Sequence, residues 1–151
     1  NFPLSIDKEQ EKWMLKTMNS RKWKQADWRF VIIHQVPFGQ GWNGYEGDHF
    51  IRKLIDKLAK SKKIDFVLSG HIHDYERLTK NYGNHTTTFV ISGGAGGGIE
   101  PKDSNPVPKM DRLIKQHHFG RMMLQKDKAM MYIYDINGEI IDQLTIHKSI
   151  K

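Results

Sequence analysis

Two apolar segments with a helical segment between them constrain the fold of this chain more than any other feature. The apolar segments cover residues 29–34 and 65–69, and each contains an unbroken run of Phe, Val, Ile or Leu. Such runs are typical of strands buried on both faces of a sheet. Between them, hydrophobic residues from Phe50 to Leu58 recur at the spacing of an amphipathic helix. A strand, a helix and a strand in about 40 residues predict a right-handed βαβ crossover and a parallel pair of strands.

The rest of the chain predicts an α/β protein whose second half is antiparallel. We expect a helix over 5–19, capped by Ser5 or Asp7, and a long glycine-containing loop at 35–47. The further segments are a strand at 87–92, a glycine-rich run at 93–98, an irregular segment at 99–116 and antiparallel strands at 118–125, 129–135 and 139–147. Asn137-Gly138, between the last two strands, predicts a hairpin turn.

The composition excludes several classes of site and leaves the partner open. The 151 residues contain no cysteine, which excludes a disulfide framework, a thiolate zinc site and a cysteine nucleophile. No apolar run approaches the ~20 residues of a membrane span. The net charge of +7 favours anionic partners, although a lysine-rich solvated surface explains it equally well. Because the chain begins with Asn1 rather than methionine, we expect a piece of a longer protein.

Three histidines follow the two predicted parallel strands and form the candidate metal site. His34 ends the first strand, and His71 and His73 follow Gly70 after the second. Ligands of open α/β sheets bind beyond the carboxyl ends of the strands, and imidazole is a preferred ligand of zinc, iron and manganese. A turn that starts at Gly70 would direct His71 and His73 to different points. The three imidazoles could hold one zinc ion with an open position, and ordinary structural histidines are the alternative.

These histidines also carry a resemblance to a known family. Val31-Ile32-Ile33-His34 and Gly70-His71-Ile72-His73 resemble the last two metal motifs, VxxH and GHxH, of the calcineurin-like metallophosphoesterases. The adjoining Tyr75-Glu76-Arg77 is similar to the purple acid phosphatase-like branch. The resemblance extends to Gln10–Trp13, Glu46–Asp48 and Gly93–Gly97, so that it covers residues 5–98.

The resemblance implies a fold, a reaction and a set of ligands. The fold would be part of a four-layer α/β/β/α sandwich, of which residues 1–151 form the carboxyl-terminal portion of a single domain. Family members hydrolyse phosphate esters, as phosphatases or phosphodiesterases, at a dinuclear centre of divalent or trivalent ions such as iron, zinc or manganese. By resemblance, His34 and His71 would bind one ion and His73 the other. The metal centre would then be completed by an amino-terminal half of the domain.

Departures from the family pattern keep other functions open. The earlier family motifs GDxx, GD and GNH supply metal-binding aspartates and an asparagine. They do not occur before the VxxH and GHxH motifs of this chain, so the isolated chain is expected to be inactive. Trp42-Asn43 stands where the plant branch has two histidines. Asp74 and Glu76 are candidate ligands or hydrogen-bonding residues. The alternative function is a non-catalytic protein-interaction module of the same fold, whereas no motif indicates nucleic-acid binding. The resemblance admits a secreted or periplasmic location.

Overall fold

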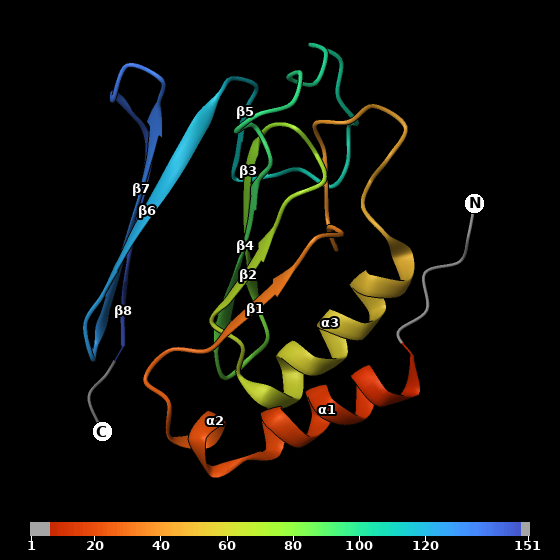
Figure 1. Ribbon diagram of the computed structural model, residues 1–151, viewed down its shortest axis with the longest axis vertical. Helices are drawn as coiled ribbons and strands as arrows, with labels where there is room; N and C mark the ends of the chain where they lie inside the picture. Colours follow the sequence, from red (N-terminus) through yellow and green to blue (C-terminus); the bar gives the residue numbers. More distant parts are fainter. Residues whose placement is uncertain (1–6, 149–151) are drawn as a thin grey trace.

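The structure is a computed structural model that describes residues 7–148. Its elements form three layers, in which helices cover one face of a five-stranded sheet and a three-stranded sheet covers the other (Figure 1). The helices are α1 (Lys8–Asn19), α2 (Arg21–Gln25) and α3 (His49–Lys62). The strands are β1 (Phe30–Ile33), β2 (Phe66–Ser69), β3 (Tyr75–Asn81), β4 (Thr86–Ser92), β5 (Arg112–Ile114), β6 (His118–Leu124), β7 (Lys128–Asp135) and β8 (Ile140–His147).

The five-stranded sheet is mixed and has the strand order β1-β2-β4-β3-β5. β1, β2 and β4 are parallel, with Phe30 opposite Phe66. β3 runs antiparallel to both β4 and β5. The three-stranded sheet β6-β7-β8 is antiparallel throughout. These findings confirm the predicted parallel pair, the antiparallel second half and the mixed α/β class.

Helix α3 packs on the parallel strands because one of its faces is apolar. Ile51, Ile55 and Leu58 are buried on that face, in the same hydrophobic cluster as Val67 of β2. Burying each such side chain stabilises the fold by roughly 1.5–3 kcal/mol. The helix begins after Asp48, whose Oδ1 accepts a hydrogen bond of 2.8 Å from the Ile51 N–H, an N-cap of about 1 kcal/mol. α3 thereby fixes the end of the loop that joins it to β1.

A buried ionic network joins the two sheets. Asp142 of β8 accepts a 2.6 Å hydrogen bond from the Tyr75 hydroxyl and a 2.8 Å hydrogen bond from Arg77 Nε, both on β3. Arg112 of β5 adds a third contact at 3.3 Å. Burial opposes ionisation of Asp142, but the hydrogen bonds from Arg77 and Tyr75 hold its pKa below the usual value. The network therefore anchors β3, the strand that follows the candidate histidines.

Several elements differ from the sequence-based expectation. β1 was expected to be buried on both faces, yet Ile32 is 77% exposed. The reason is that β1 is an edge strand that pairs with β2 alone among residues 7–148. β3, α2 and the short β5, which lies within the predicted irregular segment, were not predicted. None of the helices within the described range is long and apolar enough to cross a membrane.

Candidate metal centre

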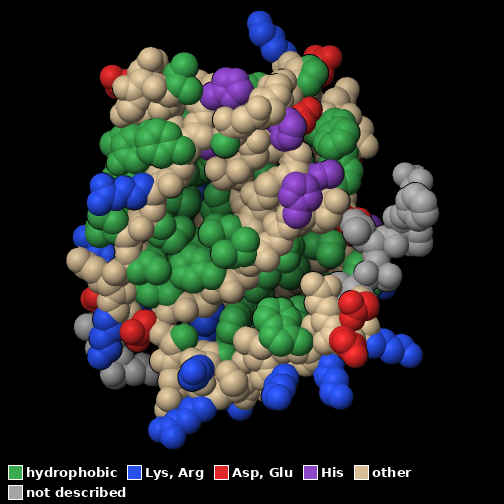
Figure 2. Space-filling view, viewed as in Figure 1, with side chains coloured by type: hydrophobic (Ala, Val, Ile, Leu, Met, Phe, Trp, Pro, Cys, Tyr) green, Lys and Arg blue, Asp and Glu red, His purple; other side chains and the backbone are tan. Residues whose placement is uncertain are grey.

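The structure brings His34 and His71 into direct contact. His34 follows β1 and His71 follows β2, and these neighbouring parallel strands end at the same edge of the sheet. His34 Nε2 lies 3.3 Å from His71 Nδ1, and the two ring centroids are 5.2 Å apart. Histidine side chains gather in the upper part of the face shown in Figure 2. Two ring nitrogens that face each other at this distance could serve as two of the ligands of one metal ion.

A tight turn after β2 separates His71 from His73. The Gly70 N–H donates to the His34 carbonyl at 3.3 Å, and the Ile72 N–H donates back to the Gly70 carbonyl at 2.8 Å. His71 adopts the left-handed conformation, with φ of 67°, which is uncommon for a residue with a Cβ and is one that histidine tolerates better than most. The two histidines therefore face different neighbours, as a turn at Gly70 predicts.

His73 is held by the glycine-rich segment. Its Nδ1 lies 2.9 Å from the Gly98 carbonyl oxygen. Because a carbonyl only accepts, Nδ1 carries the proton and Nε2 keeps its lone pair, as in metal-binding histidines. A Cβ on Gly97 would lie 2.4 Å from His73 Cε1, and one on Gly93 would lie 1.9 Å from the Ile72 carbonyl oxygen. Gly93 and Gly97 therefore allow the backbone to pack closely beside His73.

The electrostatics around His71 favour its neutral imidazole. Burial, followed by the nearby charges of His34 and His73, lowers the pKa of His71, whereas Glu100 opposes this shift. A neutral ring nitrogen has the lone pair that metal binding requires. His34 and His71, whose facing ring nitrogens are 3.3 Å apart, fit one metal ion as two imidazole ligands. Within residues 7–148, no group of three His, Asp or Glu side chains is close enough to hold a metal ion, so His73 stands apart from the pair.

An aromatic turn covers one side of His71. The rings of Trp42 and Tyr45 lie 5.6 and 5.4 Å from the His71 ring, centroid to centroid, and 5.3 Å from each other. The Tyr45 N–H donates to the Trp42 carbonyl at 3.0 Å, which closes the turn. Both residues belong to the loop between β1 and α3. This loop forms a wall of the candidate site, a role that sequence reasoning did not assign.

Two buried carboxyl groups, Asp74 and Glu76, pack against the loop between β1 and α3. The Glu76 carboxylate is fully buried and accepts hydrogen bonds from the Gln40 and Gly41 N–H groups at 2.7 and 2.9 Å. Asp74 is also fully buried, and its oxygens find no hydrogen-bond partner among the described residues. Burial, followed by the charge of Glu76, raises the pKa of Asp74 to about 8. Asp74 is therefore protonated at neutral pH, and Glu76 serves the loop rather than a metal.

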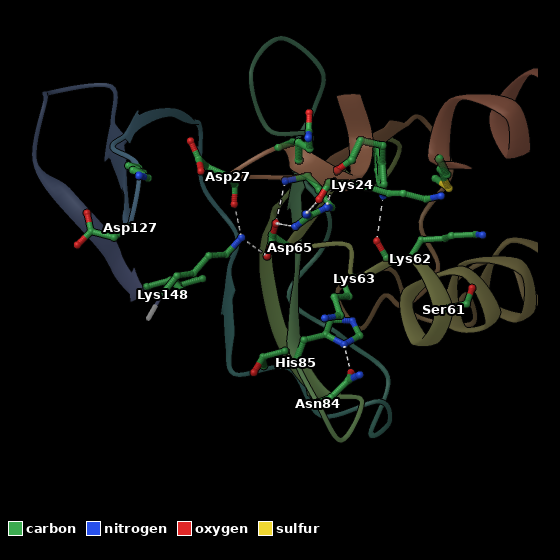
Figure 3. Close-up of a pocket in the computed structure, with 18 of the residues that line it drawn as sticks. Lys24, Asp27, Ser61, Lys62, Lys63, Asp65, Asn84, His85, Asp127 and Lys148 are labelled. Atoms are coloured by element: carbon green, nitrogen blue, oxygen red, sulfur yellow. Dashed lines mark hydrogen bonds and ion pairs between the residues drawn. The ribbon is translucent and has the colours of Figure 1, made fainter. Parts of the chain in front are cut away.

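A cavity of about 820 Å³ lies at the opposite edge of the sheet, where β1 and β2 begin (Figure 3). Its charged side chains pair with one another: Lys148 Nζ lies 2.7 Å and Arg29 Nη1 lies 3.8 Å from the Asp65 carboxylate. The Arg29 backbone N–H also donates to this carboxylate at 2.8 Å. His85 also lines this cavity, far along the strands from the histidine pair. The cavity is therefore separate from the candidate metal centre.

Comparisons with known proteins agree with this geometry. A family model described as calcineurin-like phosphoesterase matches residues 1–75. The probable inactive purple acid phosphatase 24 of Arabidopsis thaliana is 27% identical over 93% of this chain and 26% of its own length. A nucleotide pyrophosphatase/phosphodiesterase of Hordeum vulgare is 23% identical over 92% of this chain and 44% of its own. The structure of purple acid phosphatase PPD1 from yellow lupin (Lupinus luteus) covers 93% of this chain and 28% of its own at 19% identity, with a TM-score of 0.78.

The chain is similar to calcineurin-like phosphoesterases over residues 1–75 of its 151 residues. The predicted similarity to the purple acid phosphatase-like branch is confirmed, and so is the fold. The chain spans less than half the length of the two curated relatives described above.

Sequence motifs located part of the candidate site. They located His34 and His71, which meet, and His73, which packs on the glycine-rich segment. They missed Asn105, whose buried side chain holds the aromatic turn. The sequence drew attention to Trp42, because it stands where the plant branch has histidine. Asn105 could not be found in this way, because it lies in a segment without periodicity. Its role depends on contacts with residues about 60 positions away along the chain.

Proposed function

We propose that this chain is the carboxyl-terminal portion of a metallophosphoesterase domain, and that the protein containing it hydrolyses phosphate esters at a dinuclear metal centre. The contact between His34 and His71 at the ends of adjacent parallel strands carries the proposal, because it joins both family motifs in one place. In the proposal, the amino-terminal half of the domain supplies the carboxylates. The protein with both halves is called the full-length protein below.

Each histidine has a proposed role in that centre. His34 and His71 would bind one ion through the facing ring nitrogens, and His73 would bind the other through Nε2. The Gly98 carbonyl fixes the tautomer and orientation of His73. Two bound cations would neutralise the phosphoryl oxygens and lower the pKa of water. Trp42 and Tyr45 exclude bulk water from one side of His71, which strengthens electrostatic interactions there.

The test replaces the histidines one at a time in the full-length protein. His34→Ala and His71→Ala are expected to empty one metal position, and His73→Ala the other. Turnover of p-nitrophenyl phosphate and of its bis-ester should fall by orders of magnitude in all three variants, because each loses a direct metal ligand. His147→Ala, an exposed histidine at the end of β8, is the matched control and should keep both ions. Two ions retained and unchanged turnover in the three site variants would refute the assignment.

The 151-residue chain by itself should show no turnover with added zinc, manganese or iron. Neutral imidazoles bring no negative charge to hold two cations side by side, and the pair present fits one ion. Binding of one zinc ion per chain is expected, measured by calorimetry, and it should be lost in His71→Ala. Robust turnover by the purified chain, abolished in that variant, would contradict this view of the site.

A non-catalytic protein-interaction module is the second candidate function. One relative is named a probable inactive phosphatase, and within the described residues no complete metal-binding group is assembled. The retained histidine pair, with its facing nitrogens, favours catalysis instead. Full-length protein that binds both ions but turns over no phosphate ester would favour the interaction module.

A further inference from the structure

Trp42 is unusual among the residues around the histidine pair because it is apolar and remains 41% exposed. Its ring lies against His71, with a centroid separation of 5.6 Å and an interplanar angle of 42°. Tyr45 supports it, with the two ring centroids 5.3 Å apart. An aromatic ring that is supported by its neighbours and also open to solvent is available to stack with a ligand.

The backbone that carries Trp42 is held by one buried side chain. Asn105 is 6% exposed, and its Oδ1 accepts a 2.8 Å hydrogen bond from the Gly44 N–H. Its Nδ2 donates to the carbonyl oxygens of Trp42, at 2.8 Å, and of Tyr45, at 3.0 Å. The amide thus uses its acceptor and both of its donor hydrogens on a single turn. These three hydrogen bonds fix the turn against the segment around Asn105, whose backbone N–H also donates to the Gln40 carbonyl at 2.8 Å.

A second attachment restrains the same loop from the sheet. Glu76 of β3 accepts the N–H groups of Gln40 and Gly41, the two residues that precede Trp42. The backbone that carries the exposed Trp42 ring is therefore held by hydrogen bonds with both Asn105 and Glu76. A group that is ordered before binding loses little conformational entropy when a ligand arrives, which raises affinity.

We propose that Trp42 is a specificity-determining residue that stacks with a planar aromatic leaving group of the phosphate ester, and that Asn105 is the positioning residue that holds it. The inference rests on the proposed function, because the phosphoryl group must lie at His34 and His71. From there, the departing oxygen and its substituent reach the neighbouring indole ring. The leaving group is a phenol or a nucleoside, since the aryl ring of one and the base of the other present the same flat surface.

The experiment compares substrates rather than total activity. Phenyl phosphate, adenosine monophosphate and glycerol phosphate are turned over by the full-length protein and by its Trp42→Ala, Trp42→Phe and Asn105→Ala variants. Removing a stacking partner costs about 5- to 100-fold. The ratio of kcat/KM for an aromatic ester to that for glycerol phosphate should fall by this factor in Trp42→Ala and partly recover in Trp42→Phe. Trp13→Ala, a 64% exposed tryptophan on α1, is the matched control.

The aromatic substrates also identify the leaving group. A fall confined to phenyl phosphate assigns an aryl ester, and one confined to adenosine monophosphate assigns a nucleotide. Asn105→Ala should lower the same ratio, with its metal content intact, because the turn is released while the ligands stay. An equal loss on all three substrates in Trp42→Ala would overturn the proposal.

A binding measurement separates this proposal from the proposed function. Zinc-loaded protein is titrated with adenosine monophosphate, phenyl phosphate and ribose phosphate. Tighter binding of an aromatic ligand than of ribose phosphate, lost in Trp42→Ala, supports stacking even if no ester is turned over. Equal affinity for all three ligands, or no binding of any, overturns the stacking proposal. Failure of zinc to bind at His34 and His71 would instead defeat the proposed function.

Discussion

Replacing Asp74 with asparagine should remove a pH dependence of stability from this protein. Asp74 is completely buried beneath the loop that carries Trp42, and a Cβ on Gly41 would overlap its Oδ2 at 1.6 Å, so the carboxyl group packs directly against the Gly41 backbone. Burial and the charge of Glu76 raise its pKa to about 8. The native protein therefore keeps a proton that the unfolded chain releases near pH 4.

The sign and size of the change in the free energy of unfolding with pH follow from this proton. Below the unfolded pKa of about 4 both states are protonated, and the native carboxyl carries no penalty. As pH rises from about 4 to about 8, the unfolded state gains from ionisation and the native state does not, so the free energy of unfolding falls. The limiting slope is about 1.4 kcal/mol per pH unit for one proton. Burial also raises the pKa of Glu76, which adds to the slope in the same direction.

The assay is denaturant unfolding of the wild-type protein and of Asp74→Asn at several pH values between about 5 and 8. Asparagine has no titrating proton, so the variant should gain stability relative to wild type as pH rises, by up to about 1.4 kcal/mol per unit. Asp103→Asn, at an exposed aspartate, should follow wild type. Parallel curves for wild type and Asp74→Asn would refute the reasoning.

Three further predictions concern the network, the glycine run and the open edge. Asp142→Ala should destabilise the protein by roughly 3–5 kcal/mol in denaturant unfolding, because it removes the nearer carboxylate from the buried Arg77 guanidinium and leaves only Asp111, at 3.8 Å; a loss below about 1 kcal/mol would be inconsistent with a buried network. Gly97→Ala should displace His73, which a Cβ would meet at 2.4 Å, and lower the metal content of the full-length protein, whereas Gly96→Ala, with open space around it, should not. The isolated chain should bind a dye for apolar surface, because Ile32 is 77% exposed on an edge strand and an apolar hollow lies open in the face shown in Figure 2; a cooperative melt without dye binding would count against this.

Local periodicity determined the parallel part of the fold and the place of its histidines. The strands around Val31 and Val67 and the α3 helix between them could be predicted because their patterns involve only residues that are neighbours in sequence. Because parallel strands end at a common edge, His34 and His71 had to approach each other once the strands paired. The Asn137-Gly138 hairpin is local in the same sense, since Gly138 adopts the positive φ of 84° that the turn requires.

Only the tertiary structure decided which polar residues are buried and what they hold. β3 was not predicted, because its sequence is largely polar and its first residues are buried by partners far along the chain: Tyr75 and Arg77 contact Asp142, and Glu76 contacts the loop before Trp42. The same holds for Asn105, whose three hydrogen bonds reach a turn about 60 residues away. Buried polar groups must find partners, but sequence pattern records only neighbours. The long-range pairing of strands therefore chose the partners, and with them the shape of the site around His71.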